Sequence, residues 1–362
     1  MKKFDPKVVL TTTGACLSFI IGAGTVSGQE MLQFLVSFGY WGLAGCVIAL
    51  ILYSWYTMVL LDIGRALKAK SSEDSYRFFL GDKLGLVYEY FTVGLVFLIF
   101  VVMLSGAGSV LTQYLGINEV LGRVIVTSVV LATVLLGLKR LVEILGMVGP
   151  VIIIMAVLIG LVSFRSNIDG FMKAGEVMET IDIPHPTGVS NWAVSAVLYV
   201  AFTVVIAVPF YTSLGSTLER RSDAVISGLA VGVCFMAVAG VFYLGMMAQI
   251  ADVYDKPIPT LALAQNISPF FAFLFSVLIS LAIYSTSVPL CWAVCNKVAG
   301  NSVTKYRITA VVTCVIGFFG ALFPFGRIIG LVYPFLGYMG VILCIGMFYR
   351  YYINKGRATG QI

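Results

Sequence analysis

The stretch from Phe19 to Met31 carries groups that could hold a small ligand, although it lies inside the first apolar segment of the chain. Its sequence, FIIGAGTVSGQEM, contains three glycines, two hydroxyls, an amide and a carboxylate. Hydrocarbon offers the backbone no hydrogen-bond partner, so non-helical backbone at membrane depth persists only where it is buried in protein or lines a cavity. We therefore interpret the stretch as a broken helix that forms a binding site.

The glycines and the carboxylate of this stretch have different explanations. Gly22, Gly24 and Gly28 would free peptide groups to face a ligand, and a half-helix beginning near Thr25 would direct its positive end at an anion. Small residues at this spacing also let a second helix pack closely. Packing alone does not explain Glu30, because an ionisable residue within a membrane span is a functional candidate by default.

The surrounding chain has the composition of an all-α polytopic membrane protein. Of its 362 residues 60% are hydrophobic and 11% are charged, and the mean hydropathy is +1.00, whereas about a quarter of the residues in soluble domains are charged. Ten apolar segments are long enough to cross about 30 Å of hydrocarbon. They lie near residues 8–36, 42–63, 85–114, 121–138, 141–163, 191–214, 223–249, 268–299, 306–323 and 328–352.

The basic residues predict the orientation. Most of the 23 Lys and Arg residues fall in the loops on the side of the N-terminus, and the opposite side holds only Arg123, Arg165, Lys173, Lys256 and Arg327. The positive-inside rule then places both termini in the cytoplasm. No basic cluster indicates nucleic-acid binding.

Ten spans divide into two sets of five, and because five is odd, any duplication must be inverted. We expect a first repeat over 1–163, an extracytoplasmic loop over 164–190, a second repeat over 191–353 and a cytoplasmic tail over 354–362. The sixth span then matches the first, and Pro209 cannot donate to the carbonyl of Val205. We expect both of these spans to be broken in mid-membrane, with an ordinary proline kink as the alternative for the sixth.

Two further spans carry polar patterns. The third contains the small-residue patch Met103-Leu-Ser-Gly-Ala-Gly-Ser109, which favours close approach of the first helix. The eighth carries Ser285 and Thr286, whose hydroxyls could bind a small hard cation together with main-chain carbonyls. Their alternative is hydrogen bonding to carbonyls one turn earlier, which is common in membrane helices.

Other chemistries find little support in the residues. All seven cysteines lie in apolar spans, and the single histidine, His185, lies in a loop. This pattern argues against disulfides, zinc sites and histidine catalysis. We find no paired carboxylates, so we expect no enzyme and no cofactor apart from sodium as one option. Asp62, Glu89 and Glu143 lie near cytoplasmic helix ends and receive no role.

These residues resemble the YkvI-like bacterial membrane proteins, a branch of the amino acid/polyamine/organocation permease superfamily. The resemblance covers the ten-helix plan of the whole chain and rests mainly on two motifs. They are Gly22-Ala-Gly-Thr-Val-Ser-Gly-Gln-Glu30 and Val102-Met-Leu-Ser-Gly-Ala-Gly108 with Gly116 following. Weaker matches are Pro150 and the regions 199–203 and 283–286.

The resemblance implies the LeuT-type five-plus-five inverted repeat, with substrate held between the first and sixth helices. It makes the following residues candidates for substrate binding: Gly22, Ala23, Gly24, Thr25, Ser27, Glu30, Ser105, Gly106, Tyr199, Phe202 and Thr203. YkvI-like relatives often carry Asn in the sixth helix where this chain has Thr203.

Sodium-coupled relatives imply an ion site between the first and eighth helices. Its ligands here would be the carbonyls of Ser18, Ile21 and Ala282 and the hydroxyls of Ser285 and Thr286. Some proton-coupled relatives place a fifth-helix lysine at that position. The fifth span here, residues 141–163, has no lysine, which favours a bound cation or no coupling at that position.

The sequence therefore predicts a secondary transporter of a small organic solute, an amino acid or related carboxylate, that works by alternating access. Coupling to sodium, to protons or to neither stays open, and so does the oligomeric state. Glu30 would bind a substrate amine, relay a proton or neutralise part of an ion site. The alternative is a ligand-sensing subunit that resembles those of germinant receptors and binds solute without transport. We expect a multi-pass protein of the bacterial inner membrane whose partners are the solute and the lipid bilayer.

Overall fold

A computed structural model describes residues 4–21, 23–68, 72–136, 148–300 and 302–353, and these residues form helices and no strands. Eight helices are long and apolar enough to cross a membrane. They are α4 (Trp41–Leu67), α5 (Ser72–Leu115), α6 (Glu119–Leu136), α10 (Trp192–Ser216), α11 (Arg221–Ala248), α14 (Pro269–Ala299), α15 (Val303–Gly320) and α16 (Phe325–Phe348), which continues as the short π-helix η2 (Tyr349–Ile353).

Shorter helices complete the predicted ten spans. The first span is interrupted and consists of α1 (Pro6–Ile20), α2 (Ala23–Ser27) and α3 (Gln29–Phe34), followed by the 3-10 turn η1 (Val36–Phe38). Another span is α8 (Val148–Ser166), which meets α9 (Ile168–Met178) at a bend of 82°. The loop before α14 holds α12 (Ile250–Val253) and α13 (Pro259–Ile267).

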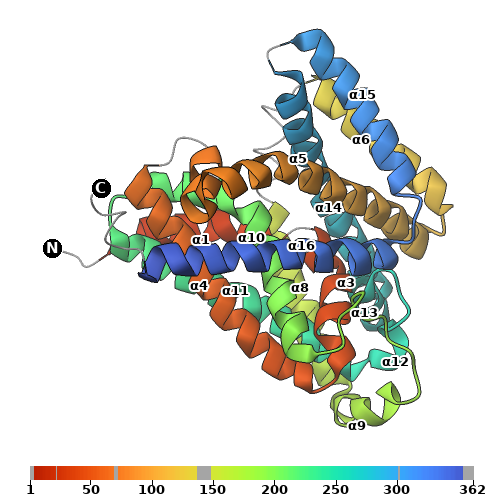
Figure 1. The fold of residues 1–362 in the computed structure, drawn as a ribbon. Helices are drawn as coiled ribbons and strands as arrows, with labels where there is room; N and C mark the ends of the chain where they lie inside the picture. The colour runs from red at the N-terminus through yellow and green to blue at the C-terminus, as the bar shows by residue number, and fades with distance from the viewer. Residues whose placement is uncertain (1–3, 22, 69–71, 137–147, 301, 354–362) are drawn as a thin grey trace.

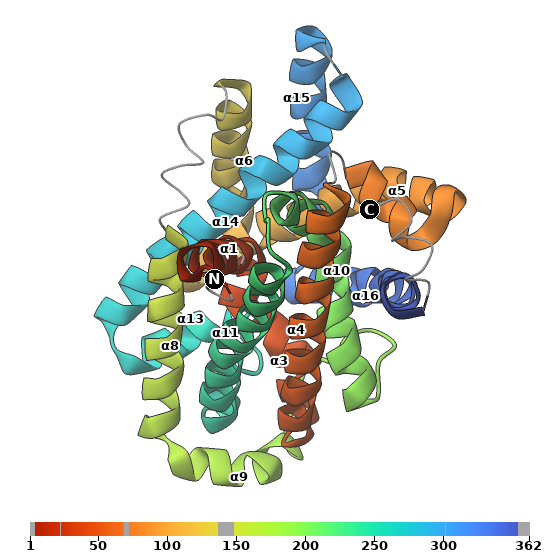
Figure 2. The same ribbon diagram turned by 90° about the vertical axis from the view of Figure 1, so that its left-hand side faces the viewer.

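The long helices form two groups (Figure 1). In the first group, which we call the bundle, α4 packs against α10 and α11, and α1 packs against α11 and α10. In the second group, which we call the scaffold, α5, α6, α14 and α15 pack against one another. In Figure 2 α6 and α15 rise from the top of the molecule, while α9 lies at the bottom. Helix α16 packs against both α10 and α5, and α8 packs against α11.

Glycines allow the bundle helices to approach at backbone distance. A side chain at Gly64 of α4 would collide with the backbone of Thr212 in α10, and one at Gly228 of α11 would collide with the backbone of Met58 in α4. A side chain at Gly340 of α16 would meet the backbone of Ala201. Small residues have this use in membrane proteins because lipid supplies no hydrophobic force that drives helices together.

Helix α10 passes through Pro209 without a break, so the predicted interruption of the sixth span is wrong. Proline leaves the carbonyl of Val205 without its helical donor. The hydroxyl of Tyr76, from α5, donates to that carbonyl at 2.6 Å. A side chain distant in sequence thus satisfies the backbone, and the ordinary proline alternative holds.

The proposed repeat boundaries remain predictions. Helix α8 runs to Ser166, three residues past the expected end of the first repeat, and α9 occupies part of the expected loop over 164–190. Residues 137–147, which include the start of the predicted fifth span and Glu143, lie outside the described residues, as does the tail over 354–362.

Candidate functional site

The first span is broken where the sequence predicts it. Helix α1 ends at Ile20, and Gly28 lies between α2 and α3 with φ of 78°, a left-handed conformation that favours glycine. A side chain at Gly28 would also overlap those of Met246 and Thr260. The Thr260 hydroxyl, from α13, donates to the carbonyl of Val26 at 2.6 Å. Helix α13 therefore packs directly onto the break.

Glu30 lies on the first turn of α3 and folds back over α2. It is 4% exposed, and the hydroxyl of Thr25 donates to its Oε2 at 3.2 Å. The hydroxyl of Tyr333, from α16, lies beside Gly24 on the same side as the carboxyl. A Cβ at Gly24 would overlap Glu30 Oε1 and lie 3.0 Å from the Tyr333 hydroxyl. Gly24 is therefore needed to make room for the Glu30 carboxyl.

Aromatic rings surround this carboxyl. The ring of Tyr333 stacks on that of Phe202 with centroids 4.4 Å apart, and Phe34 lies 6.3 Å from Phe202 and 6.0 Å from Tyr199. The hydroxyl of Tyr199 is fully buried and has no hydrogen-bond partner among the described residues. An unpaired buried hydroxyl costs free energy. A ligand that paired with it would recover that cost.

No basic side chain reaches Glu30 among the described residues. Their ion pairs involve Asp62, Glu89, Glu119 and Asp255, all of them elsewhere. The segment 8–64, which contains α1 from Val8 onward, α2, α3 and most of α4, has no Lys, Arg or His, and neither has α10. Among the described residues, the carboxyl lies near hydroxyls and aromatic rings and near no basic side chain.

The structure brings together several of the residues predicted to bind substrate. Gly24, Thr25 and Glu30 lie together at the break, and Phe34 of α3 links this segment to Tyr199 and Phe202 of α10. Their role in substrate binding stays a prediction. Thr203 follows Phe202 in α10, and its hydroxyl forms a hydrogen bond with the hydroxyl of Tyr56 at 3.2 Å. Gly22 and the side chain of Ala23 lie outside the described parts of the chain.

Other predicted residues serve the packing of the fold. The Ser27 hydroxyl donates to the carbonyl of Gly24 at 2.6 Å, inside the break itself. In α5, the Ser105 hydroxyl donates to the carbonyl of Phe323 at 2.9 Å, and Gly106 makes room for the ring of Phe325. The patch on α5 that we expected beside the first helix thus receives the beginning of α16 at these positions.

Two residues near Glu30, Tyr333 and Phe34, are not among the site residues predicted from the sequence. Tyr333 precedes Pro334 within α16, and this proline is the feature of the tenth span that could have drawn attention to it. Phe34 is one apolar residue among many on α3. Their roles follow from contacts between elements that are distant in sequence.

The chain has distant relatives of known sequence and of known structure, although no family model matches it. It is 22% identical over 334 residues to the uncharacterised membrane protein YkvI of Bacillus subtilis, covering 90% of this chain and 92% of that protein. It is 23% identical over 331 residues to the uncharacterised protein YyaD of the same organism, covering 91% and 93%.

Among solved structures, it resembles the inward-facing conformation of Mhp1 with a TM-score of 0.64 at 16% identity, over 96% of this chain and 77% of that one. It resembles MhsT in complex with L-phenylalanine with a TM-score of 0.56 at 15% identity, over 95% and 87%. The chain is homologous to YkvI and has the LeuT-type fold. The resemblance inferred from the sequence motifs is confirmed.

Two hydrogen bonds fasten α16 to segments beside the broken first span. The amide of Gln33 donates to the carbonyl of Gly326 at 2.8 Å, which fastens α3 to α16. The backbone amide of Thr187, in the loop between α9 and α10, donates to the carbonyl of Gly330 at 2.8 Å. A closed form of Mhp1 with bromovinylhydantoin bound matches this chain with a TM-score of 0.51, lower than the inward-facing form.

The sodium ligands implied by the resemblance remain a prediction. The hydroxyls of Ser285 and Thr286 both donate to the carbonyl of Ala282, each at 2.9 Å, as the hydrogen-bonding alternative predicts. Helix α14 packs against α2, whereas α1, which carries Ser18, packs against α11 and α10. Within the described residues, no cluster of three or more His, Cys, Asp or Glu side chains could hold a metal ion.

Asp62 and Glu89, to which the sequence assigns no role, both form ion pairs away from Glu30. Asp62 binds Arg65 at 2.8 Å and Arg221 at 3.0 Å, and accepts a hydrogen bond from Tyr351 at 2.8 Å. This cluster ties α4 to the start of α11 and to η2. We call this side the Asp62 end, and it is the predicted cytoplasmic end. Glu89 similarly binds Lys297 of α14 at 2.7 Å.

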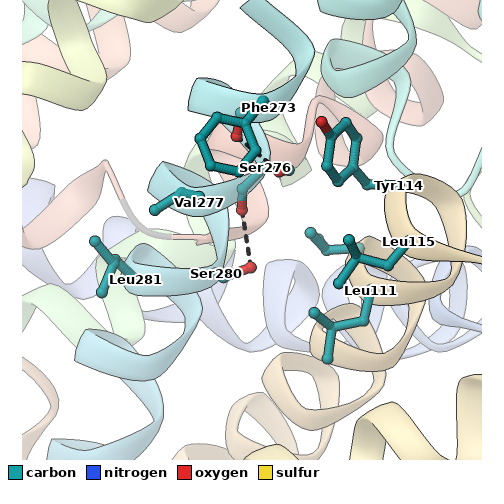
Figure 3. Close-up of a pocket in the computed structure, with 9 residues that line it drawn as sticks. Leu111, Tyr114, Leu115, Phe273, Ser276, Val277, Ser280 and Leu281 are labelled. Carbon is teal, nitrogen blue, oxygen red and sulfur yellow. Dashed lines mark hydrogen bonds between the residues drawn. The ribbon is translucent and has the colours of Figure 1, made fainter. Parts of the chain in front are cut away.

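A separate cavity of about 280 Å³ lies between α5 and α14 (Figure 3). The hydroxyls of Ser276 and Ser280 at its edge donate to carbonyls of their own helix. The cavity therefore offers a mainly apolar surface, and it shares no residue with the surroundings of Glu30. Its walls are formed by Val110, Leu111, Tyr114, Leu115, Phe273, Ser276, Val277, Ser280 and Leu281.

Proposed function

We propose that this protein is a secondary transporter of a small solute that carries an amine and an apolar body, with the amine bound by Glu30. The observation that carries the proposal is the buried carboxyl of Glu30, which has no basic partner among the described residues and is bordered by aromatic rings. The LeuT-type fold, shared with the transporter Mhp1, supports transport as the use of this site.

The geometry favours an amine over the other roles left open for Glu30. The carboxyl already lies against Gly24, where the glycine motif was expected to receive a solute carboxylate. Two carboxylates at such close range repel each other. An ammonium group is attracted both by a carboxylate and by the faces of Tyr and Phe rings, as in aromatic cages that bind cationic ligands. An amino acid would therefore bind with its ammonium, rather than its carboxylate, at Glu30.

Alternating access would require the contacts around the broken first span to open and close in turn. The end bearing α3, α9 and α13 is fastened by the bonds from Gln33 to Gly326 and from Thr260 to Val26. Release of these contacts would open a path from that side, while movement of the bundle relative to the scaffold would open the other.

A matched set of ligands tests the chemistry of the site. We expect phenylethylamine, phenyltrimethylammonium and L-phenylalanine to raise the melting temperature of the purified protein, because a ligand selective for the native state stabilises it. 3-Phenylpropionate, which has the same ring but only a carboxylate, should not. Stabilisation by phenylpropionate alone would show that the site binds anions.

Transport is tested separately from binding. Proteoliposomes loaded with unlabelled phenyltrimethylammonium should accumulate the labelled compound by counterflow, and its permanent charge prevents leakage through the lipid. Binding without counterflow would indicate a sensing subunit rather than a transporter. Vesicles that contain Glu30→Gln protein provide the control for non-specific uptake.

A further inference from the structure

The cavity between α5 and α14 lies at membrane depth and borders on the lipid. It extends from Phe273 to Leu281 along α14, which is about 12 Å at a rise of 1.5 Å per residue. Because α14 begins at Pro269, the cavity lies in the half of the hydrocarbon layer nearer α13. Phe273, Val277 and Leu281 in its wall are 54%, 40% and 37% exposed. On a membrane-spanning helix, such exposed apolar side chains face the lipid hydrocarbon.

The lining of this cavity favours an apolar occupant. None of the nine described residues that line it carries a charge, so an ammonium solute finds no counter-charge here. The hydroxyl of Ser276 donates to the carbonyl of Phe273, and that of Ser280 donates to the carbonyl of Ser276, both at 2.8 Å. A buried water is held by roughly two to four polar groups, whereas the serine protons here are already used within α14.

The size and shape of the cavity suit a hydrocarbon chain. An apolar cavity of about 150 Å³ already binds benzene, and this one has about 280 Å³. The rings of Tyr114 and Phe273, with centroids 6.3 Å apart, lie at one end, and Leu111 and Leu281 lie towards the other (Figure 3). Tyr114 is the penultimate residue of α5, so its hydroxyl is at the end nearer the lipid headgroups, where tyrosine is favoured.

An occupant of this cavity would stabilise the scaffold through packing. The hydrophobic effect does not drive a lipid chain into the cavity, because lipid tails are as apolar as the lining. The atoms that line an empty cavity do, however, lack van der Waals partners, and a chain in the cavity supplies them. Helices α5 and α14 pack against each other, and α2 of the broken first span packs against both. The filling of this cavity therefore supports the helices that hold the break.

We propose that one acyl chain of a phospholipid, from the leaflet nearer α13, occupies this cavity and completes the packing between α5 and α14. The site recognises the chain rather than the headgroup. The neighbours of Tyr114 in sequence, Gln113 and Leu115, are uncharged. The nearest basic residue along the chain, Arg123, is 2% exposed and binds Glu119 at 2.6 Å. Neutral and anionic phospholipids should therefore bind equally well.

A variant that fills the cavity with its own side chain tests the proposal. Dioleoylphosphatidylcholine and dioleoylphosphatidylglycerol, added to delipidated protein in detergent, should raise the melting temperature of wild type by the same amount. Ser280→Phe should at least halve that increase, because its ring takes the place of the chain. Ser213→Phe, at an exposed position of α10, is the matched control and should keep the full increase. A full increase in Ser280→Phe, or an increase with the anionic lipid alone, would overturn the proposal.

Photo-crosslinking of the wild-type protein locates the chain without any substitution. The protein is reconstituted in dioleoylphosphatidylcholine vesicles that contain a trace of phosphatidylcholine with a diazirine in the middle of one chain. After illumination, the label should concentrate in the segments 110–115 and 273–281 and should be unaffected by phenylethylamine. Labelling spread evenly over the exposed helices, α15 included, would show that no such site exists. Displacement of the label by phenylethylamine would show that the cavity holds solute instead of lipid.

Discussion

Two buried carboxylates at different depths of the bundle have opposite surroundings. Glu30 is 4% exposed and Asp62 is 5% exposed. Asp62 is bound by two arginines and a tyrosine, so its charge is balanced within the protein. Among the described residues, Glu30 lies near the hydroxyls of Thr25 and Tyr333 and near aromatic rings, and near no basic side chain. The two carboxylates are about equally buried, so the counter-charge is what separates them, and this difference is why the proposed binding role is given to Glu30 and not to Asp62.

The largest expected effect comes from filling the space that Glu30 occupies. Gly24→Val should insert and fold yet bind no phenylethylamine, because its side chain would displace the Glu30 carboxyl and the Tyr333 hydroxyl. Thermal-shift titration measures the loss. Gly94→Val is the matched control, since a Cβ at Gly94 meets nothing within 4 Å. Normal affinity in folded Gly24→Val would mean that the glycine is not part of the site.

The next effect tests the unbalanced carboxylate itself. Glu30→Gln should weaken phenylethylamine binding by about 10-fold to 100-fold, because a hydrogen bond to a charged group contributes roughly 1.5–3 kcal/mol. Its melting temperature without ligand should not fall, since Gln keeps the size of the side chain and removes a buried charge that has no counter-charge. Isothermal titration and thermal unfolding measure the two quantities. Wild-type affinity in the Gln variant would leave Glu30 with a structural role only.

Replacing Asp62, whose charge is balanced by arginines, should affect stability rather than ligand affinity. Asp62→Asn should lower the free energy of unfolding by about 2 kcal/mol, because Arg65 and Arg221 lose a partner that is buried. Affinity for phenylethylamine should change less than twofold. Thermal unfolding with and without the ligand compares the two residues directly. A large loss of affinity would place Asp62 in the binding mechanism and end the contrast with Glu30.

A smaller effect is expected at the unpaired hydroxyl. Tyr199→Phe should keep or raise the melting temperature, because it removes a buried hydroxyl that has no partner. Tyr211→Phe should lower it by a small amount, since the carbonyl of Cys16 loses its donor. A drop of more than a few degrees in Tyr199→Phe would show that its hydroxyl is paired in solution.

The smallest effect is expected from sodium. We expect sodium to raise the melting temperature slightly more than potassium does. The effect should be small because the hydroxyls of Ser285 and Thr286 must first break their hydrogen bonds to the carbonyl of Ala282. The Ser285→Ala and Thr286→Ala double variant should remove the difference. Equal stabilisation by sodium, potassium and choline in wild type would contradict the predicted ion site.

The first and sixth spans show what sequence reasoning can reach. The break of the first span is predicted correctly because its cause is local, in glycines that lie within a few residues of the interruption. The same reasoning fails at Pro209, where the outcome depends on a hydroxyl from Tyr76, 129 residues away along the chain. A local signal for strain does not reveal whether a distant group relieves that strain.

In the candidate site, too, some residues could be predicted from the sequence and others only from helix packing. Glu30 was identified from the sequence because a carboxylate within an apolar span is anomalous wherever it lies. Its partners Tyr333 and Phe202 are ordinary residues of ordinary spans, and only helix packing places them around the carboxyl. Ser105 and Gly106 have the small polar character expected of a binding site, yet packing assigns them to the start of α16.

The sequence by itself determined the membrane class, the ten spans and the position of the anomalous carboxylate, because hydrophobicity and charge are properties of single residues and short segments. Only the tertiary structure decided which carboxylate lacks a counter-charge and which hydroxyl lacks a partner among the described residues. These facts depend on contacts between helices that are far apart in the chain. Such contacts are set by the shapes of packed surfaces, which no local pattern of residues encodes.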